Sequence, residues 1–431
     1  MKPYKEYKDS GIPWIGEIPK DWKVCKAKYV FADGVDSLKI GPFGSALKGK
    51  TLSYGKYKIY NQTNLIQRDF NLSHNFVSEK TYKQLHAYFV NAGDILFSMM
   101  GTIGKCCIMP AGYPKGIMDS HLLKTKLSNK IYPHFFVYIY DKDNSNVVIE
   151  QLTYMSNGTI MSGLNSSIVK NVYITLPDIT NQHRIADYLD RKTSAIDTLI
   201  EDKQKMIELL KEQRQTIISE AVTKGLDKNV KMKDSGIEWI GKIPEDWEIK
   251  KVKYVYNIQK AKMPNTLYNN YIDDSEIYLS MDIIRGNFQE IYYSLDGNFA
   301  YENELLLLWD GSNAGEIIIK HPKGYAPSTT AILTLIINMN TDFAMYYMKL
   351  LELRLRERTI GMGVPHVDGT YLRNLPFLIP NIEIQSSIAF YLNKQVIKID
   401  NIINNITTQI EKLKEYRQAI ISEAVTGKVE I

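Results

Sequence analysis

Residues 8–22 read KDSGIPWIGEIPKDW, and residues 233–247 read KDSGIEWIGKIPEDW. Twelve of these fifteen positions are identical, and two Trp, two Gly and one Pro recur at fixed places. A match of this quality does not arise by chance, so this segment is an internal repeat. Because repeats decide architecture before any local feature does, we interpret the chain as two related halves.

A second pair of repeated segments closes each half. Residues 208–223 read ELLKEQRQTIISEAVT, and residues 411–426 read EKLKEYRQAIISEAVT. The offset of 203 residues holds without a gap back to Pro177 and Pro380. The layout of each half is therefore a short motif, a variable insert and a conserved segment.

The two inserts, residues 23–176 and 248–379, share only faint echoes, such as Pro-Lys-Gly at 114–116 and at 322–324. A scaffold that is written twice around two different inserts suggests one task performed on two different targets. A duplicated, pseudo-symmetric fold whose inserts have simply drifted apart is the alternative, because repeats report architecture before function.

Two long helices are predicted over residues 182–222 and 385–425, which contain no Pro. Apolar residues recur every seven positions over about five heptads, which is typical of a coiled coil. Each helix of about 40 residues would be about 60 Å long, and we expect the two to pack as an antiparallel rod that holds two domains. Arg214 and Arg417 fall on the apolar seam, where they fix the register or meet a partner protein.

Composition sets broad limits on function. The chain has 431 residues with 44% apolar and 23% charged residues, which suits two or three folded domains. The net charge of +5 permits a nucleic-acid partner without requiring one. None of the three Cys forms a C-x-x-C pair, which disfavours disulfides and zinc. With no apolar run of about 18 residues, we expect a soluble, cytoplasmic protein.

A search for catalytic motifs yields one formal match. Residues 44–51, GSALKGKT, fit the phosphate-binding loop pattern, but that loop works only between a buried strand and a helix. Neither flank suits those elements. Gly101-Thr102-Ile103-Gly104 is interpreted as a tight turn. G-x-S-x-G, H-E-x-x-H and Pro-Pro are absent from the sequence, so we predict no catalytic residue and no metal ligand.

Three features together resemble the specificity subunits of type I restriction–modification systems, nearly end to end. The first is the duplicated D-S-G-I-x-W-I-G-x-I-P-x-D-W motif. The second is the pair of helices that follow Leu-Pro at 176–177 and Ile-Pro at 379–380 and close on IISEAVT. The third is GPFGS at 41–45, which the second insert lacks in clear form.

The resemblance implies a mixed α/β (α+β) fold with an internal pseudo-two-fold repeat. Two globular target-recognition domains would be joined by two long antiparallel coiled-coil helices. Each domain would recognise half of a bipartite DNA site, and the helices would set the spacer. The implied divisions are residues 1–176 for the first motif and domain and 177–230 for the central helix. The second motif and domain then occupy residues 231–379, and the C-terminal helix occupies 380–431.

The resemblance also implies partners for this chain. Besides double-stranded DNA, these are two methyltransferase subunits that modify adenine with S-adenosylmethionine. In complexes that also cut DNA, two motor-nuclease subunits that use ATP and Mg²⁺ would join them. We expect no cofactor on this chain, no membrane contact and no catalysis by the chain itself.

DNA recognition needs Lys or Arg for phosphates and polar side chains for base edges. By residue type and loop-like context, the candidates in the first insert are Ser45, Lys48, Lys50, Gln62, Asn64, Lys105 and His121. Those in the second insert are Lys260, Lys262, Arg285, Asn313, Lys323, Ser328 and Thr329. Candidates for binding a partner protein are Trp14, Trp22, Trp239, Trp247, Arg214 and Arg417.

Three other functions remain open at this stage. A non-catalytic protein-interaction scaffold would carry the same repeats without binding DNA. An enzyme that uses the 44–51 loop would bind ATP through Lys50. The recognition part of a single-chain restriction enzyme would need a catalytic motif elsewhere. DNA binding that depends on salt and on half-site spacing separates the first of these from the specificity subunit.

Overall fold

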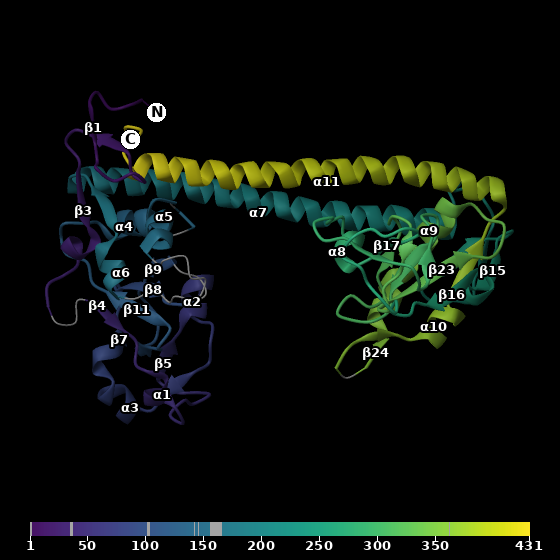
Figure 1. Cartoon of the computed structure of the whole chain (residues 1–431), viewed down its shortest axis with the longest axis horizontal. Coiled ribbons are helices and arrows are strands. Elements are labelled where there is room, and N and C mark those ends of the chain that lie inside the picture. The colour runs from purple at the N-terminus through teal and green to yellow at the C-terminus, as the bar shows by residue number, and fades with distance from the viewer. Residues whose placement is uncertain are drawn as a thin grey trace. The chain divides into compact units, whose positions relative to one another are not determined.

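The computed structural model describes residues 2–34, 38–100, 104–141, 143–144, 146–155, 166–361 and 363–431 (Figure 1). The chain divides into two compact units. Unit 1 contains Met1–Lys203 and Thr407–Ile431, and unit 2 contains Gln204–Ile406. The predicted boundaries at 176 and 379 separate a domain from its helix, whereas the compact units divide each long helix near its middle.

The two predicted long helices are present as α7 (Ile179–Lys224) and α11 (Ile382–Val425). Near the start of each helix, a side-chain oxygen of Asp178 or Asn381 accepts a hydrogen bond from a backbone N–H three residues further on. Gly225 and Gly427 follow the helix ends in the left-handed conformation that favours glycine.

Within each unit, the seam residues of the two helices are buried or half-buried. An ion pair lies on the seam in each unit. In unit 1, Arg417 of α11 contacts Asp197 of α7 at 2.9 Å, and in unit 2, Arg214 of α7 contacts Asp400 of α11 at 2.6 Å. Lys203 also donates to Gln409 at 2.6 Å, so the segments of unit 1 run antiparallel. Of the two interpretations of the seam arginines, the structure supports register.

Each unit contains one globular domain built on two four-stranded sheets. We call residues 23–176 the first domain and residues 248–379 the second domain. In the first domain, one sheet has the order β4 (Leu38–Ile40), β11 (Leu122–Thr125), β8 (Ile95–Ser98), β9 (Cys106–Ile108). The other has the order β6 (Phe76–Val77), β5 (Tyr57–Tyr60), β10 (Gly116–Met118), β7 (Phe89–Val90).

The second domain repeats this arrangement strand for strand. Its first sheet has the order β16 (Tyr256–Lys260), β23 (Thr330–Leu335), β20 (Leu305–Leu308), β21 (Ile317–Ile318). Its second sheet has the order β18 (Tyr292–Ser294), β17 (Glu276–Tyr278), β22 (Gly324–Tyr325), β19 (Phe299–Ala300). In both domains the one parallel pair among these described strands is the same, β5 with β10 and β17 with β22. The predicted internal repeat is confirmed, and it extends into the divergent inserts.

Smaller elements complete each unit. The repeated motifs form the hairpins β1 (Tyr7–Asp9) with β2 (Glu17–Pro19) and β13 (Met232–Asp234) with β14 (Lys242–Pro244). Two further strand pairs lie next to the long helices in sequence, namely β3 (Lys23–Lys26) with β12 (Tyr173–Leu176), and β15 (Glu248–Lys251) with β26 (Pro376–Ile379). A further hairpin in unit 2 joins β24 (Thr359–Ile360) and β25 (His366–Val367).

The shorter helices lie within the two domains. In the first they are η1 (Ala27–Val30), α1 (Gly44–Leu47), α2 (Gln62–Gln67), α3 (Glu79–Gln84), η2 (His86–Tyr88), α4 (Pro133–Tyr140), α5 (Asn146–Met155) and α6 (Ser166–Asn171). In the second they are η3 (Val252–Tyr254), α8 (Met281–Ile284), α9 (Thr341–Glu357) and α10 (Gly369–Asn374).

Each domain is attached to its long helix by a buried glutamine at a repeat-equivalent position. Gln182 donates to the Pro177 carbonyl at 2.9 Å and accepts from the backbone N–H of Tyr132, just before α4. Gln385 donates to the Pro380 carbonyl at 2.7 Å and accepts from Asn340, just before α9. Since both amides are buried and satisfied, they fix the entry of each domain onto its helix.

Two tryptophans that we predicted to bind a partner protein are instead part of the core. Trp22 is 0% and Trp247 is 1% exposed. Trp22 packs near Gly427, after the end of α11, and Trp247 packs near Gly225, after the end of α7. Their burial leaves no side-chain surface for a partner, so this prediction is wrong for both residues.

A close approach of strands recurs at Gly116 and Gly324, the glycines of the Pro-Lys-Gly echo. A Cβ atom at Gly116 would lie 2.2 Å from the Lys58 carbonyl oxygen, and one at Gly324 would lie 2.2 Å from that of Ile277. Both obstacles are backbone atoms of the parallel partner strand, so neither can move aside. Only glycine allows this strand pair to form.

We predict that Gly116→Ala destabilises the first domain by about 1–3 kcal/mol, because the added methyl group overpacks a rigid strand pair. Urea unfolding monitored by circular dichroism measures the change. The control is Gly363→Ala, where the new Cβ would meet nothing within 4 Å. Equal effects of the two substitutions would show that the close approach is not a constraint.

Candidate DNA interface

Several chain segments meet at one end of the first sheet of the first domain. Gly41 donates its N–H to the Leu122 carbonyl, Met99 donates to His121, and Asp119 donates to Tyr60, each at 2.9 Å. These bonds gather the loop after β4, the residues after β8, the start of α2 and the turn between β10 and β11. We call this group, residues 40–45, 60–62, 98–100 and 119–121, the first sheet end.

The second domain has an equivalent group. Ala261 donates to the Thr330 carbonyl at 3.0 Å, Trp309 donates to Thr329 at 2.7 Å, and Leu279 donates to Tyr325 at 2.9 Å. We call residues 260–263, 279–281, 308–310 and 327–329 the second sheet end. The second sheet end is thus formed by strands that are equivalent to those of the first and that have the same order in their sheets.

Three predicted residues of the first domain, Ser45, Gln62 and His121, lie at the first sheet end. His121 is held in place by Asp119, whose carboxylate accepts from the His121 N–H at 2.9 Å and contacts its ring Nδ1 at 3.0 Å. The His121 side chain is nevertheless about half exposed. Gln62 occupies the first turn of α2 and is partly exposed, and its Oε1 accepts a hydrogen bond from the Ser98 hydroxyl at 3.4 Å. These groups can offer hydrogen bonds to base edges.

Asn64 was also predicted to contact DNA, and the structure contradicts this. The side chain is 0% exposed. Its amide donates to the Leu72 carbonyl at 2.6 Å and to Asp69 at 3.1 Å, while its oxygen accepts from the Asn61 N–H at 3.0 Å. Asn64 therefore completes the capping box of α2 and secures the following loop.

The lysines of the first domain differ in their availability. Lys48 and Lys50 are exposed and follow α1, and neither forms an ion pair with any residue that the structure describes. Helix α1 has only four residues, so Gly44–Thr51 lacks the long helix that a phosphate-binding loop requires. Lys105, opposite Ser98 at the start of β9, is ion-paired with Asp143 at 2.7 Å.

In the second domain, four predicted residues, Lys260, Lys262, Ser328 and Thr329, lie at the second sheet end. Lys260 contacts the Asp310 carboxylate at 2.9 Å and lies over the Trp309 ring. Asn313 is exposed in the turn that follows Asp310. Ser328 is half-buried and Thr329 is exposed. Lys262 is exposed and forms no ion pair with any described residue. This end therefore combines the neutralised Lys260 and the unpaired Lys262 with neutral hydrogen-bonding groups.

The remaining two predicted residues are engaged in ion pairs. Arg285 makes a bidentate contact with Glu316, both bonds at 2.6 Å, and this contact lowers the pKa of the Glu316 carboxyl. Lys323 is paired with Glu276 at 2.9 Å, which raises the pKa of the Lys323 ammonium. Lys323 precedes β22, whereas Ser328 follows it, so Lys323 lies away from the second sheet end.

The two domains differ strongly in charge. The first contains 18 Lys and Arg against 9 Asp and Glu, which gives +9, whereas the second contains 13 against 15, which gives −2. A positively charged domain attracts a polyanion from a distance, and a nearly neutral one does not. If both domains bind DNA, the first must rely more on attraction to phosphates, and the second must rely more on contacts with bases.

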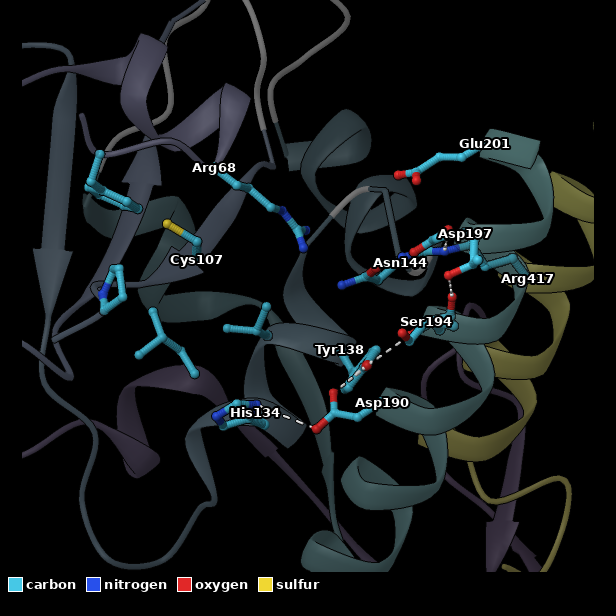
Figure 2. Close-up of a pocket in the computed structure, with 16 residues that line it drawn as sticks. Arg68, Cys107, His134, Tyr138, Asn144, Asp190, Ser194, Asp197, Glu201 and Arg417 are labelled. Atoms are coloured by element: carbon cyan, nitrogen blue, oxygen red, sulfur yellow. Dashed lines mark hydrogen bonds and ion pairs between the residues drawn. The ribbon is translucent and has the colours of Figure 1, made fainter. Parts of the chain in front are cut away.

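A cavity of about 550 Å³ lies elsewhere in unit 1, between the first domain and α7 (Figure 2). Its side chains are largely paired with one another. Tyr138 donates to Asp190 at 2.6 Å, His134 lies 3.7 Å from the same carboxylate, and Arg417 contacts Asp197. None of the predicted DNA-contacting residues lines this cavity. Its polar groups connect the domain to the long helix.

Four side chains at the sheet ends were not singled out from the sequence: Phe43, Met263, Trp309 and Asp310. Residues 93–96 (Gly-Asp-Ile-Leu) and 303–306 (Asn-Glu-Leu-Leu) each precede a Gly, at 101 and at 311, and aligning these segments places Met100 opposite Asp310. That alignment could have pointed to Trp309 and Asp310. Phe43 belongs to the GPFGS motif, but nothing in the sequence showed that its side chain would be exposed.

Among the candidates for partner binding, Trp14 and Trp239 remain partly accessible. Trp14 packs against Tyr154 with ring centroids 5.5 Å apart, and the Arg354 guanidinium lies over the Trp239 ring.

The predicted turn at Gly101–Gly104 lies mostly outside the described residues. In the part of the chain that is described, no helix is long and apolar enough to span a bilayer, and no cluster of His, Cys, Asp or Glu is suited to a metal ion.

Comparison with known proteins identifies the class. The family described as "Type I restriction modification DNA specificity domain" matches residues 32–209 and 244–412, once in each half. The chain therefore belongs to this family and carries two such domains. The resemblance to specificity subunits that the repeated motifs indicated is confirmed, and so is the prediction of a DNA sequence-specificity subunit at the level of the family.

Individual relatives agree with this assignment. The type I restriction enzyme MjaVIII specificity subunit of Methanocaldococcus jannaschii is 32% identical over 191 residues, which is 44% of each chain. The putative MjaX specificity subunit of the same organism is 24% identical over 97% of this chain and 96% of its own.

Solved structures share the fold. A chain from a study of complex assembly and conformational transition of the type I R-M system superposes with a TM-score of 0.72 at 15% identity, covering 96% of this chain and 99% of that chain. The HsdS subunit of Thermoanaerobacter tengcongensis gives 0.50 at 15% identity, covering 96% and 98%. These similarities confirm the predicted fold class of two α/β domains and two long helices.

The contrast between Asn64 and Gln62 can be tested directly. We expect Asn64→Ala to lower stability by about 1–3 kcal/mol, because buried backbone groups lose their partners. Gln62→Ala should change stability by no more than about 0.5 kcal/mol and weaken binding to the cognate duplex about tenfold through a lost base contact. Urea unfolding and fluorescence anisotropy measure the two effects. A reversed pattern would contradict the placement of both residues.

Proposed function

We propose that each domain recognises one half of a bipartite double-stranded DNA site through its sheet end, and that α7 and α11 set the spacer between the half-sites. Membership of the DNA specificity family supports this role. The observation that carries it is the pair of equivalent sheet ends, which present different side chains on one fold. Recognition of two different half-sites requires two equivalent backbone arrangements that carry different side chains for contact with the bases.

The chain would act without catalysis of its own. We propose that two methyltransferase subunits bind it and modify adenine with S-adenosylmethionine, and that two motor-nuclease subunits join in complexes that cut DNA with ATP and Mg²⁺. A scaffold that is repeated twice offers the same surface twice, including the accessible faces of Trp14 and Trp239, which supports two copies of one partner. The complex would work in the cytoplasm, on chromosomal and invading DNA.

A scaffold that binds proteins but not DNA was the main alternative. It gives no reason why two inserts with divergent sequences keep one fold and equivalent sheet ends. No observation favours it, and none favours an ATP-binding enzyme built on residues 44–51.

Adenine methylation mapped across the genome tests the proposal. We expect deletion of this gene, with its methyltransferase partner intact, to remove methylation from one split motif. Exchange of the second domain for that of a relative should change one half of the motif and leave the other half and the spacer unchanged. An unaltered map after deletion would show that the chain does not direct methylation.

The charge difference between the domains predicts an unequal salt dependence. Each phosphate contact contributes about 0.9 to the slope of log affinity against log salt concentration. Replacing Lys48 and Lys50 with Gln in the assembled complex should therefore reduce that slope by about 1.8. Titration of a labelled duplex at several salt concentrations measures it.

The matched control replaces Lys260 and Lys323 with Gln in the second domain. Both lysines already neutralise carboxylates, so binding of phosphate would leave Asp310 or Glu276 unpaired, and Lys323 also lies away from the second sheet end. We expect the slope to fall by less than about 0.9 for the two together. Equal losses for the two double variants would refute the unequal division of phosphate contacts.

A further inference from the structure

Phe43 has an unusual position for a large apolar side chain. It is 87% exposed, the highest value among the exposed large hydrophobic residues of the described chain. It lies three residues after the end of β4, at the first sheet end. Ser45, Lys48 and Lys50 follow it within one short stretch.

The backbone that carries Phe43 is held firmly. Gly41 donates to the Leu122 carbonyl at 2.9 Å, and a Cβ atom at Gly41 would lie only 1.6 Å from the Asp119 carbonyl oxygen. Pro42 is buried and has a restricted backbone. The loop is thus pressed against the turn that carries His121, and Phe43 extends from a rigid support.

The second domain has an apolar side chain at the equivalent place. Ala261 donates to Thr330 as Gly41 donates to Leu122, so residue 263 corresponds to residue 43. That residue is Met263, which is 53% exposed, and Pro264 beside it is buried. The two loops share no sequence motif. The common feature is an exposed apolar group beside the hydrogen-bonding residues of each sheet end.

Single exposed apolar residues are common and usually need no explanation. Two at the same place in divergent domains, both next to the proposed base-contacting groups, call for one. Phe and Met are among the residues that proteins insert between base pairs to unstack and kink a duplex. A wedge must be rigidly supported and solvent-exposed in the free protein, and Phe43 meets both requirements.

We propose that Phe43 and Met263 insert into the base stack, one in each half-site, and locally deform the duplex. This inference rests on the proposed function, and it adds recognition by deformability to recognition by hydrogen bonds. Each half-site would then favour a flexible step, such as TA or CA, at the point of insertion. Ser45, Gln62 and His121 would contact bases beside the step in the first half-site.

The experiment uses the complex of this chain with its methyltransferase partner and a duplex that carries the mapped methylation motif. 2-Aminopurine, an adenine analogue whose fluorescence increases on unstacking, replaces bases at successive positions. With the wild-type chain we expect increased fluorescence at one step in each half-site. Phe43→Ala should remove the increase in the first half-site alone, and Met263→Ala in the second alone.

Each alanine variant should also bind the cognate duplex about tenfold more weakly and leave binding to unrelated DNA unchanged. Phe43→Leu should restore most of the fluorescence signal, because leucine can also serve as a wedge. The matched control is Tyr29→Ala. Tyr29 is 59% exposed on η1, beside Val30, whose carbonyl accepts from the Ser128 N–H, and away from the first sheet end, so its removal should change nothing.

The outcomes separate this inference from the proposed function. If the wild-type complex binds the motif and the alanine variants keep both fluorescence signals, the wedge is refuted while DNA recognition stands. A wild-type complex that shows no motif-specific binding would refute the proposed function itself. Thermal unfolding of Phe43→Ala should match the wild type, since that side chain is almost fully exposed. Met263→Ala also removes the sulfur that accepts a hydrogen bond from Tyr278 at 3.5 Å, so thermal unfolding checks that this variant is folded.

Discussion

The structure depends on one interaction that is made twice across the seam of the long helices. Arg417 pairs with Asp197, and Arg214 pairs with Asp400, and each partner differs from its counterpart by 203 residues. A seam of apolar residues alone would tolerate a slip of one heptad. A charged residue on the seam does not, because a slip would leave a half-buried guanidinium without its carboxylate. These pairs contribute less to stability than to the choice of a single register.

The first of these ion pairs also joins the helices to a domain. Arg417 donates to the Asp143 carbonyl and to the Asn144 side chain, each at 3.2 Å, in the segment after α4. Together with Gln182, which fixes the start of α4, it ties the first domain to α7 and to the end of α11. In the second domain, Gln385 makes the corresponding link to α9. Glutamines and seam residues that are identical in the two halves thus attach each domain to the long helices.

The repeats made the architecture predictable, while the sheet ends were predictable only in part. Heptad spacing and the 203-residue offset gave both helices to within a few residues, because these signals depend on local periodicity. Residue type and loop-like context selected Gln62, His121, Lys260 and Thr329, which lie at the sheet ends and whose contacts with DNA stay predictions, but they could not distinguish Gln62 from Asn64. That distinction depends on which amide points toward the Leu72 carbonyl, which is a tertiary contact.

The same limitation explains the two tryptophans and the paired cations. Trp22 and Trp247 appeared to be surface anchors because they recur in a motif, yet they recur because each fills the space at a helix end. Arg285 and Lys323 were chosen for their charge, and their carboxylate partners lie 31 and 47 residues away in the chain. Sequence shows a charge but does not show whether another residue has already neutralised it.

The difference in charge between the domains also affects the rates at which each domain associates with DNA and dissociates from it. Long-range attraction governs how fast a protein meets DNA, whereas short-range contacts govern how long it remains. A domain with a net charge of +9 would associate with DNA first, and its non-specific attraction would allow the complex to slide along the duplex. A domain of −2 has little net long-range attraction for DNA, so its short-range contacts with the half-site would mainly lengthen the time that the complex stays bound.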